Sequence, residues 1–262
     1  MLSNTLLRCC LFAGLIMSAA SQAAVTTTPI ECSDHGQTFA GLLVTPQASA
    51  EKRPLVLLVH NWMGVTAESE KQAARFAELG YTVFVADIYG KGVRPKDAKE
   101  AGAQAGLYKN DRALFRQRLN AALNAGLQQQ GVDSSNVAVI GYCFGGTGAI
   151  ELARSGAPLQ AVVSFHGGLD SPTPADGKNI NSPVLALHGA DDPYVPAAEL
   201  SAFEAEMQSN NVSYELIQYP GAVHSFTDMG AGNDNSKGAA YNAAADEQSF
   251  AAASQFLANN LQ

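Results

Sequence analysis

The stretch VAVIGYCFGGTGAIELA, residues 137–153, carries the strongest signal for the fold. The four apolar residues at 137–140 predict a strand buried on both faces, and the residues from 146 onward have helical spacing. Between them lies Gly141-x-Cys143-x-Gly145, the pattern of a nucleophile elbow with cysteine where serine is commoner. The sequence therefore predicts a strand–turn–helix unit that presents Cys143 at the carboxyl end of a strand.

Cys143 is the candidate nucleophile. An elbow lifts this residue out of the sheet, and it requires small residues two positions before and after, since larger side chains would collide. The N-terminus of the following helix faces the sulfur and favours the thiolate. Three other interpretations stay open: an inert buried cysteine, a disulfide with Cys32, and a phosphate-binding turn. The last is disfavoured because G-x-x-x-G-G differs from the G-x-G-x-x-G of dinucleotide sites.

Strands and helices alternate on both sides of this unit. Apolar runs predict strands at 38–46, 55–60, 82–87, 137–141, 161–167, 184–189 and 214–220, with 38–46 pairing in a hairpin with the segment around 30–33. Helical spacing predicts helices at 66–80, twice between about 95 and 129, and at 146–154, 197–209 and 238–259. The alternation predicts an α/β fold with a mostly parallel central sheet and helices on both faces. Ligands of such sheets bind at the carboxyl ends of the strands.

Residues 1–23 are predicted to be a secretory signal peptide. A single arginine precedes an apolar run at 11–17 that is too short to span a bilayer, and small residues follow up to a predicted cleavage site after Ala23. Cys9 and Cys10 come before the apolar run, whereas a lipoprotein cysteine would follow it, so no stable membrane anchor is expected. We expect export to a bacterial periplasm, in preference to full secretion.

The remaining residues, 24–262, have the composition of one globular domain. Hydrophobic residues make up 47% of the chain, the formal net charge is −8, and no stretch is rich in Lys and Arg. This balance argues against nucleic acid and anionic membranes as partners. A small-molecule partner is expected instead, and the sequence favours neither a monomer nor a small homo-oligomer.

A cysteine nucleophile needs a base, and the base needs an acid that orients it. In α/β-hydrolases the acid precedes the histidine in the chain. Asp192 follows the strand at 184–189 in a G-x-x-D-x-x-V-P turn, with Asp191 as the neighbouring alternative. His224 is the only histidine after the strand at 214–220 and is therefore the candidate base.

The oxyanion that forms at an attacked carbonyl needs two N–H donors. We expect one from Phe144, directly after the nucleophile, and one from Trp62, in the loop that follows the strand at 55–60. The histidines and aspartates match no metal-binding spacing such as H-E-x-x-H, so neither a metal nor an organic cofactor is expected.

With these residues in order, the chain resembles the dienelactone hydrolase family over about residues 38–258. The motifs that carry the resemblance are HNWMG (60–64), VADIYGKG (85–92), GYCFGG (141–146), SFHGG (164–168), HGADDPYVP (188–196) and GAVHSF (221–226). The resemblance implies an α/β-hydrolase fold, a catalytic triad of Cys143, Asp192 and His224, and oxyanion donors at Phe144 and Trp62. It also implies cysteine-dependent hydrolysis of a carboxylic ester or lactone.

Three positions depart from the family's best-known members. Those members have a glutamate that controls the resting thiol where this chain has Asn61, so activation of Cys143 is expected to fall to His224 directly. Two arginines that bind a substrate carboxylate match Lys91 and Asp228, so an anionic dienelactone is expected to bind poorly.

Motif position alone places four residues in the expected substrate pocket: Asn61, Lys91, Tyr142 and Phe226.

A competing hypothesis from a different class is an exported hydrolase-like protein that binds a ligand without turnover. A thiol-redox role for Cys143 is a third hypothesis, and the absence of a C-x-x-C pair disfavours it.

Overall fold

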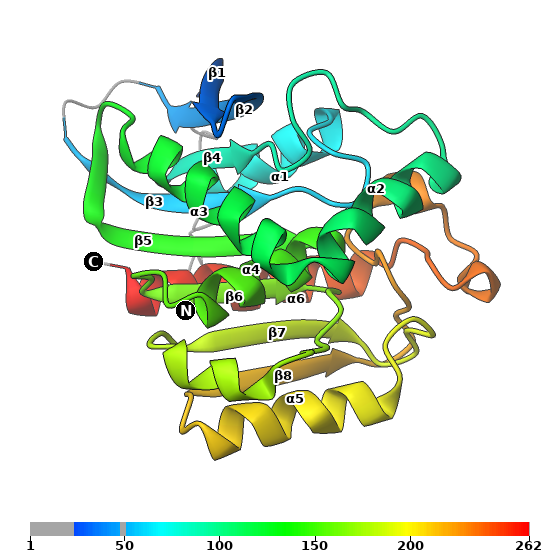
Figure 1. The fold of residues 1–262 in the computed structure, drawn as a ribbon. Coiled ribbons are helices and arrows are strands. Elements are labelled where there is room, and N and C mark those ends of the chain that lie inside the picture. The colour runs from blue at the N-terminus through cyan, green and yellow to red at the C-terminus, as the bar shows by residue number, and fades with distance from the viewer. Residues whose placement is uncertain (1–23, 48–50, 262) are drawn as a thin grey trace, which may run out of the picture.

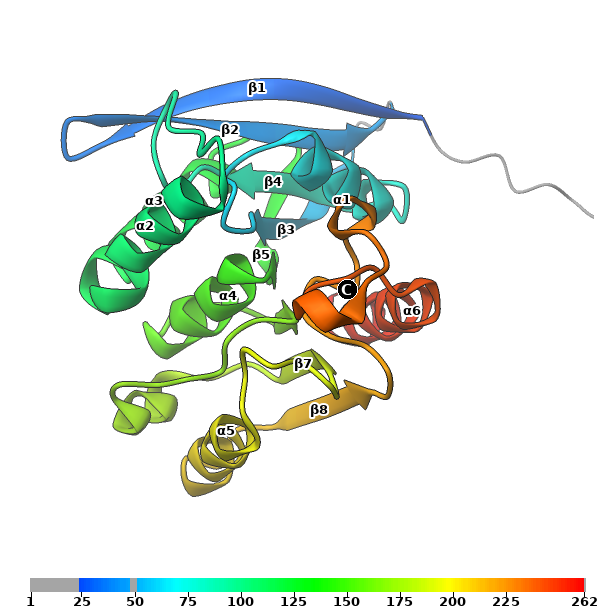
Figure 2. The same cartoon turned by 90° about the vertical axis from the view of Figure 1, so that its right-hand side faces the viewer.

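The computed structural model describes residues 24–47 and 51–261. The predicted signal peptide lies outside the described residues. Those that are described form one eight-stranded sheet in the order β1-β2-β4-β3-β5-β6-β7-β8, flanked by helices (Figures 1 and 2).

An antiparallel hairpin forms one edge of the sheet, as predicted. β1 (Val25–Asp34) pairs with β2 (Gln37–Pro46) across a two-residue turn, and β2 also runs antiparallel to β4 (Thr82–Ala86). Both turn residues, His35 and Gly36, have positive φ angles, which is the conformation that suits the twist of a tight hairpin.

The other strand pairs are parallel. β3 (Arg53–Val59) lies between β4 and β5 (Val132–Tyr142), and β6 (Ala161–Phe165), β7 (Val184–Gly189) and β8 (Tyr214–Tyr219) continue the sheet in chain order. Every residue of β4, β6 and β7 is buried. This explains why their sequences are continuous apolar runs rather than alternating ones.

Helices cover both faces of the sheet (Figure 2). One face carries α2 (Ala98–Asn110), α3 (Arg112–Leu127), α4 (Phe144–Arg154) and α5 (Ala197–Ser209), and the other carries α1 (Ala67–Ala77) and α6 (Ala243–Asn260). Each layer buries its own apolar cluster, with Phe115 and Met207 in the first and Phe76 and Leu257 in the second. The predicted α/β-hydrolase fold is confirmed.

The last helix begins later than predicted. Residues 238–242, predicted to start it, instead end a loop whose earlier part holds the short turns η2 (Met229–Ala231) and η3 (Asn235–Lys237). Helix α6 starts at residue 243, because the Asn242 side chain accepts a hydrogen bond from the Ala245 N–H and caps the helix there.

A buried ion-pair network ties α4 to its neighbours. The Arg154 guanidinium, fully buried, binds Glu151 at 2.8 Å and Glu206 of α5 at 2.6 Å. Arg116 of α3 binds the other oxygen of Glu151 at 2.7 Å. The helix that follows Cys143 is therefore held rigidly from two sides.

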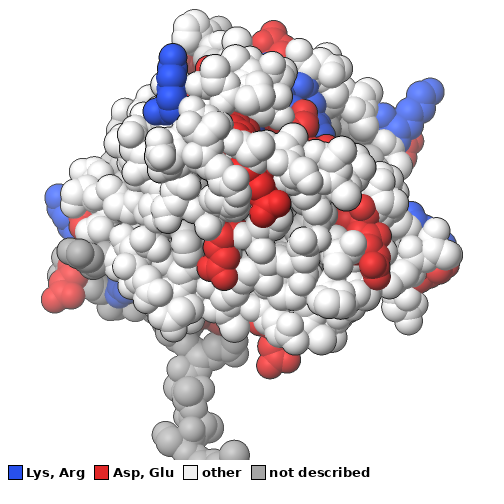
Figure 3. Space-filling model, turned by 90° about the horizontal axis from the view of Figure 1, so that it is seen from below, with Lys and Arg blue, Asp and Glu red and all other residues white. Residues whose placement is uncertain are grey.

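The surface is consistent with the acidic composition. On the face seen in Figure 3, acidic side chains are scattered over the middle and lysines and arginines lie towards the margin. None of the helices within the described ranges has the length and apolarity needed to cross a membrane.

Candidate active site

Cys143 lies at a strained turn between β5 and α4. Its φ and ψ angles are 56° and −116°, a conformation that non-glycine residues rarely adopt. The flanking glycines are required by space: a Cβ on Gly141 would lie 1.9 Å from the Gly145 carbonyl oxygen, and one on Gly145 would lie 2.1 Å from the Val59 carbonyl oxygen. This is the geometry of a nucleophile elbow, with the sulfur held at the carboxyl end of the sheet.

A chain of hydrogen bonds links Cys143 to His224 and Asp192. The Nε2 atom of His224 lies 3.0 Å from the Cys143 sulfur, and its Nδ1 lies 2.7 Å from Asp192 Oδ2. The other Asp192 oxygen accepts the Tyr194 N–H at 2.8 Å, so the buried carboxylate is fully engaged. Asp191 is exposed. Of the two candidate acids, the structure brings Asp192 to the histidine.

The charges of this chain favour a thiolate–imidazolium pair. Burial raises the pKa of the Cys143 thiol, but the charge and hydrogen bond of His224, with the N–H groups of Phe144 and Trp62, outweigh it and hold the pKa below its ordinary value. Burial lowers the pKa of His224, but the Cys143 charge and the Asp192 hydrogen bond outweigh it and raise that pKa to about 10. Opposite shifts of this kind are expected when a proton moves from the thiol to the ring.

The loop before α6 holds His224 in place. The His224 N–H donates to the Gly238 carbonyl at 3.2 Å, and the Ala240 N–H donates to the His224 carbonyl at 3.0 Å. The rings of His166 and Tyr194 pack edge-on against the imidazole, with centroids 5.2 and 5.4 Å away. This support could not be predicted from the sequence, because the Ala- and Gly-rich loop acts through its backbone.

Two backbone N–H groups converge on the Cys143 sulfur. They belong to Trp62, after β3, and to Phe144, at the start of α4, and both help to hold the pKa of the Cys143 thiol below its ordinary value. These are the two N–H groups expected from the sequence as oxyanion donors.

The loop that presents Trp62 is held by three side chains that the sequence did not identify in this role. The Asn61 carbonyl, which belongs to the same peptide group as the Trp62 N–H, lies 2.6 Å from His60 Nδ1. The next peptide is held at both ends, since the Tyr89 hydroxyl donates to the Trp62 carbonyl at 3.0 Å and the Met63 N–H donates to Asn61 Oδ1 at 2.9 Å. His60 Nε2 accepts the Ile88 N–H at 3.2 Å, which leaves Nδ1 as the donor to Asn61.

His60 stays neutral in this position. It is fully buried, and burial lowers the pKa of its ring to about 4. Its ring stacks on Phe144 and meets Tyr89 edge-on, with centroids 5.9 and 4.7 Å apart. The loop and the start of α4 therefore form one packed unit around the two donors.

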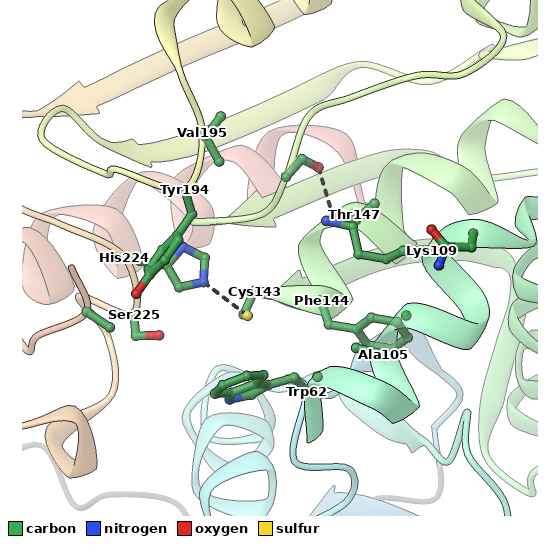
Figure 4. Close-up of a pocket in the computed structure, with 15 residues that line it drawn as sticks. Trp62, Ala105, Lys109, Cys143, Phe144, Thr147, Tyr194, Val195, His224 and Ser225 are labelled. Atoms are coloured by element: carbon green, nitrogen blue, oxygen red, sulfur yellow. Dashed lines mark hydrogen bonds between the residues drawn. The ribbon is translucent and has the colours of Figure 1, made fainter. Parts of the chain in front are cut away.

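A cavity of about 540 Å³ opens beside the sulfur. Cys143 lies between His224 on one side and Phe144 on the other, with Trp62 across from Val195 (Figure 4). Helix α2, which the sequence did not connect with the site, supplies a wall. The lining residues are Trp62, Gly102, Ala105, Gly106, Lys109, Asn110, Cys143, Phe144, Thr147, Gly168, Tyr194, Val195, His224, Ser225 and Ala239.

The four residues predicted for the pocket from motif position are not among those that line this cavity. Asn61 uses its side chain within its own loop. Lys91 points to the surface, where its ammonium binds Glu31 at 2.6 Å. Tyr142 and Phe226 are buried in the apolar cluster that faces α1 and α6. Successive residues of a strand point to opposite faces, so the residue before the nucleophile is turned away from it.

Two further expectations are settled by geometry. Cys32 and Cys143 are both free thiols, so the alternative of a disulfide between them is wrong. Asp228 caps the turn η2 through a hydrogen bond from the Gly230 N–H at 2.7 Å and does not line the cavity. Neither Lys91 nor Asp228 therefore decides the charge inside the cavity.

Comparison with known proteins points to one family. The dienelactone hydrolase family pattern matches residues 39–261. A dienelactone hydrolase-like promiscuous phosphotriesterase from metagenomic libraries is 35% identical and superposes with a TM-score of 0.86, covering 91% of this chain and 100% of that chain.

Two sequence relatives agree with this assignment. A Bradyrhizobium protein provisionally named 2-oxo-3-(5-oxofuran-2-ylidene)propanoate lactonase is 25% identical over 206 residues, which is 75% of this chain and 82% of the relative. A Yersinia pestis protein provisionally named carboxymethylenebutenolidase is 26% identical over 215 residues, which is 77% of each chain.

Proposed function

The chain belongs to the dienelactone hydrolase family and is a hydrolase of ester or lactone bonds, and from that premise we propose that it works through a catalytic triad of Cys143, His224 and Asp192. The observation that carries the proposal is the pair of contacts on His224, 3.0 Å to the sulfur and 2.7 Å to the carboxylate. A nucleophile, a base and an orienting acid in hydrogen-bond reach are the arrangement that covalent acyl transfer needs.

In the first half of the reaction the Cys143 thiolate attacks the substrate carbonyl carbon and a C–S bond forms. The oxyanion accepts hydrogen bonds from the Trp62 and Phe144 N–H groups. As the C–O bond breaks, the leaving alkoxide takes the proton held on His224 Nε2. The product is a thioester on Cys143 and a free alcohol, or a ring-opened chain in the case of a lactone.

In the second half His224, now neutral, takes a proton from water, and the hydroxide attacks the thioester. The C–S bond breaks, the carboxylic acid leaves, and the thiolate–imidazolium pair is restored. Asp192 keeps Nδ1 protonated and the ring oriented throughout. Asn61 takes no part in proton transfer, because its side chain bears no titratable group.

The competing hypothesis of ligand binding without turnover does not explain the backbone strain and the N–H groups at Cys143. A binding protein needs neither the strained Cys143 backbone nor two N–H donors aimed at one sulfur. Strain at a single residue persists where the surrounding structure enforces it, and it is concentrated at functional sites.

Hydrolysis of a small neutral aryl ester tests the proposal. Protein starting at residue 24 should hydrolyse 4-nitrophenyl acetate with saturation kinetics, and the Cys143→Ala variant should not exceed the background rate. A Cys32→Ala variant, the matched control, should keep wild-type activity. Equal activity of wild type and Cys143→Ala would show that Cys143 is not the nucleophile, and inactivity of the wild type would favour the binding hypothesis.

A further inference from the structure

One stripe of helix α2 lines the cavity, and two of its residues are glycines. The stripe follows helical spacing and consists of Gly102, Ala105, Gly106 and Lys109. These positions extend over two turns, which is about 10 Å along the helix axis. Helix α2 therefore gives the cavity a long wall, and this wall lies beside Phe144 (Figure 4).

Neither the backbone nor the packing requires glycine at these two positions. Both glycines lie within the helix, and neither has a positive φ angle. A Cβ on Gly102 would meet no heavy atom of the described residues within 4 Å, its own turns of backbone apart, and one on Gly106 would meet Asn110 Nδ2 at 3.8 Å. By contrast, a Cβ on Gly148 in α4 would lie 2.8 Å from the Phe115 ring.

Glycine inside a helix is nevertheless unfavourable. Relative to alanine it lowers the equilibrium for helix formation about fivefold at each position. Helix α2 has little burial to offset this, since its buried residues are Ala101, Ala105 and Tyr108. What Gly102 and Gly106 share is the cavity, where a side chain at either position would take up open space.

The α2 wall is fixed relative to the nucleophile. The Tyr108 ring stacks on Tyr89 and meets Phe144 edge-on, with centroids 5.5 and 6.1 Å apart. Phe144, the residue after Cys143, stacks in turn on Phe115 at 4.6 Å. The space that the glycines leave open therefore keeps its position beside the sulfur.

The groups along this wall suit a carbon chain. Ala105 and the Phe144 ring are apolar, and the Thr147 hydroxyl is already engaged because it donates to the Gly168 carbonyl at 2.9 Å. Lys109 is exposed, and a lysine in such a place can lay its methylene stem on apolar surface while its ammonium stays in water.

The reaction geometry says which part of a substrate meets this wall, and this step rests on the proposed function. His224 must give its proton to the leaving oxygen, so the leaving group lies on the side of His224 and Tyr194. Ala105 and Lys109 of α2 lie on the other side of Cys143 (Figure 4). The acyl part of the substrate therefore extends from the sulfur along α2.

We propose that Gly102 and Gly106 open an acyl subsite for an unbranched apolar chain. The preferred substrates are then esters or lactones of neutral acids whose chain has several methylenes. A cavity of about 540 Å³ has the size that accommodates a drug-sized ligand, which is far more than an acetyl group fills. A wall two helical turns long is matched by an extended chain.

Two activated esters with the same leaving group measure the subsite. 4-Nitrophenyl hexanoate has four more methylenes than 4-nitrophenyl acetate, and full burial of one methylene raises affinity about fourfold. The quantity measured is the ratio of kcat/KM for hexanoate to kcat/KM for acetate, each divided by the rate constant of that ester with hydroxide. The wild-type ratio should exceed about 10, because the wall covers only part of the chain.

A side chain placed in this space should lower the ratio. Gly106→Leu should lower it about tenfold, and Gly106→Ala, which adds one methyl group, about threefold. Gly106→Ala should also raise the urea midpoint of unfolding, because alanine is the better helix former. Lower activity with a more stable helix is a combination that a merely structural role of the glycine does not produce.

Ala103→Leu is the matched control. It enlarges an exposed residue of the same helix that does not line the cavity, and should leave the ratio within about twofold of wild type. An unchanged ratio in Gly106→Leu, or an equal fall in Ala103→Leu, would overturn the proposal. Slower hydrolysis of both esters by one factor would also overturn it, since the glycine would then serve the helix and not the acyl chain.

A second pair of esters tests the placement of the acyl part. Phenyl acetate and 4-butylphenyl acetate differ by four carbons on the leaving group. Gly106→Leu should leave the ratio for this pair within about twofold of wild type, and a fall as large as that for the hexanoate pair would contradict the placement. Failure of the proposed function has a different signature, since wild type and Cys143→Ala would then hydrolyse both 4-nitrophenyl esters at equal rates.

Discussion

Removing one hydroxyl from Tyr89 should slow the chemical step without weakening substrate binding. The Tyr89 hydroxyl donates to the Trp62 carbonyl at 3.0 Å, and the ring is 1% exposed. The Trp62 carbonyl and N–H share one Cα, so loss of this hydrogen bond frees the ψ angle of Trp62 and loosens the N–H that would bind the oxyanion. A Tyr89→Phe variant keeps the ring and its packing.

The magnitude follows from the contact. A neutral hydrogen bond contributes about 0.5–1.5 kcal/mol net, and the Asn61–Met63 hydrogen bond still holds the other end of the same peptide. We expect a loss of about 1 kcal/mol of transition-state stabilisation, which corresponds to a kcat about fivefold lower. KM should change by less than about twofold, because the donors act on charge that develops after binding.

Steady-state hydrolysis of 4-nitrophenyl acetate and urea unfolding of the same samples check this prediction. Tyr108→Phe is the control, since Tyr108 stacks on Tyr89 with centroids 5.5 Å apart while its hydroxyl faces Arg118 and Gln104. It should lose stability of similar size but keep its kcat. The reasoning is refuted if Tyr89→Phe keeps the kcat of Tyr108→Phe, or if the loss appears in KM alone.

Three other predictions follow from the packing and the charges. Gly145→Ala should destabilise the protein by about 1–3 kcal/mol in urea unfolding, because its Cβ would lie 2.1 Å from the backbone oxygen of Val59; wild-type stability would contradict the elbow geometry. Asp192→Asn removes a charge that raises the pKa of His224, so the pKa of Cys143 should rise towards its ordinary value. The pH midpoint of iodoacetamide alkylation should therefore move upward, and an unchanged midpoint would show that the carboxylate does not support the ion pair. Arg154→Met leaves two buried glutamates without their shared partner and should cost about 3–5 kcal/mol of unfolding free energy, whereas a cost below about 1 kcal/mol would mean that the network is dispensable.

The fold and the central residues could be predicted because they depend on local sequence and on one topological rule. Cys143, Asp192 and His224 each follow a strand, and the parallel strands of such a sheet end at one edge, so the three side chains had to meet there. The glycines around Cys143 are fixed by contacts within a few residues of the turn and by the adjacent end of β3. Trp62 and Phe144 were predicted as donors in the same way, from their positions after strand ends.

The walls of the cavity could not be predicted, because they come from segments whose position depends on tertiary packing. Helical spacing predicts α2, but it does not say that Lys109 and Ala105 line the cavity that opens beside the sulfur. Ala239 lines the cavity from the loop before α6, and it contacts His224 through a backbone β-bridge. A backbone contact of this kind leaves no pattern in the side chains from which it could be predicted. Conversely, Tyr142 and Phe226 lie within two residues of Cys143 and His224 in the sequence, but strand and loop geometry direct their side chains to the other face of the sheet.

The central claim is that acyl transfer passes through Cys143, and rapid-quench mass spectrometry of the wild type with 4-nitrophenyl acetate tests it most directly. The reaction is stopped in acid during the first turnover and the protein is digested. The account predicts an acetyl group on the peptide that contains Cys143, forming and decaying at rates consistent with kcat and absent in Cys143→Ala. An acetyl group on another residue at those rates, or release of product with an unmodified Cys143 throughout, would contradict it.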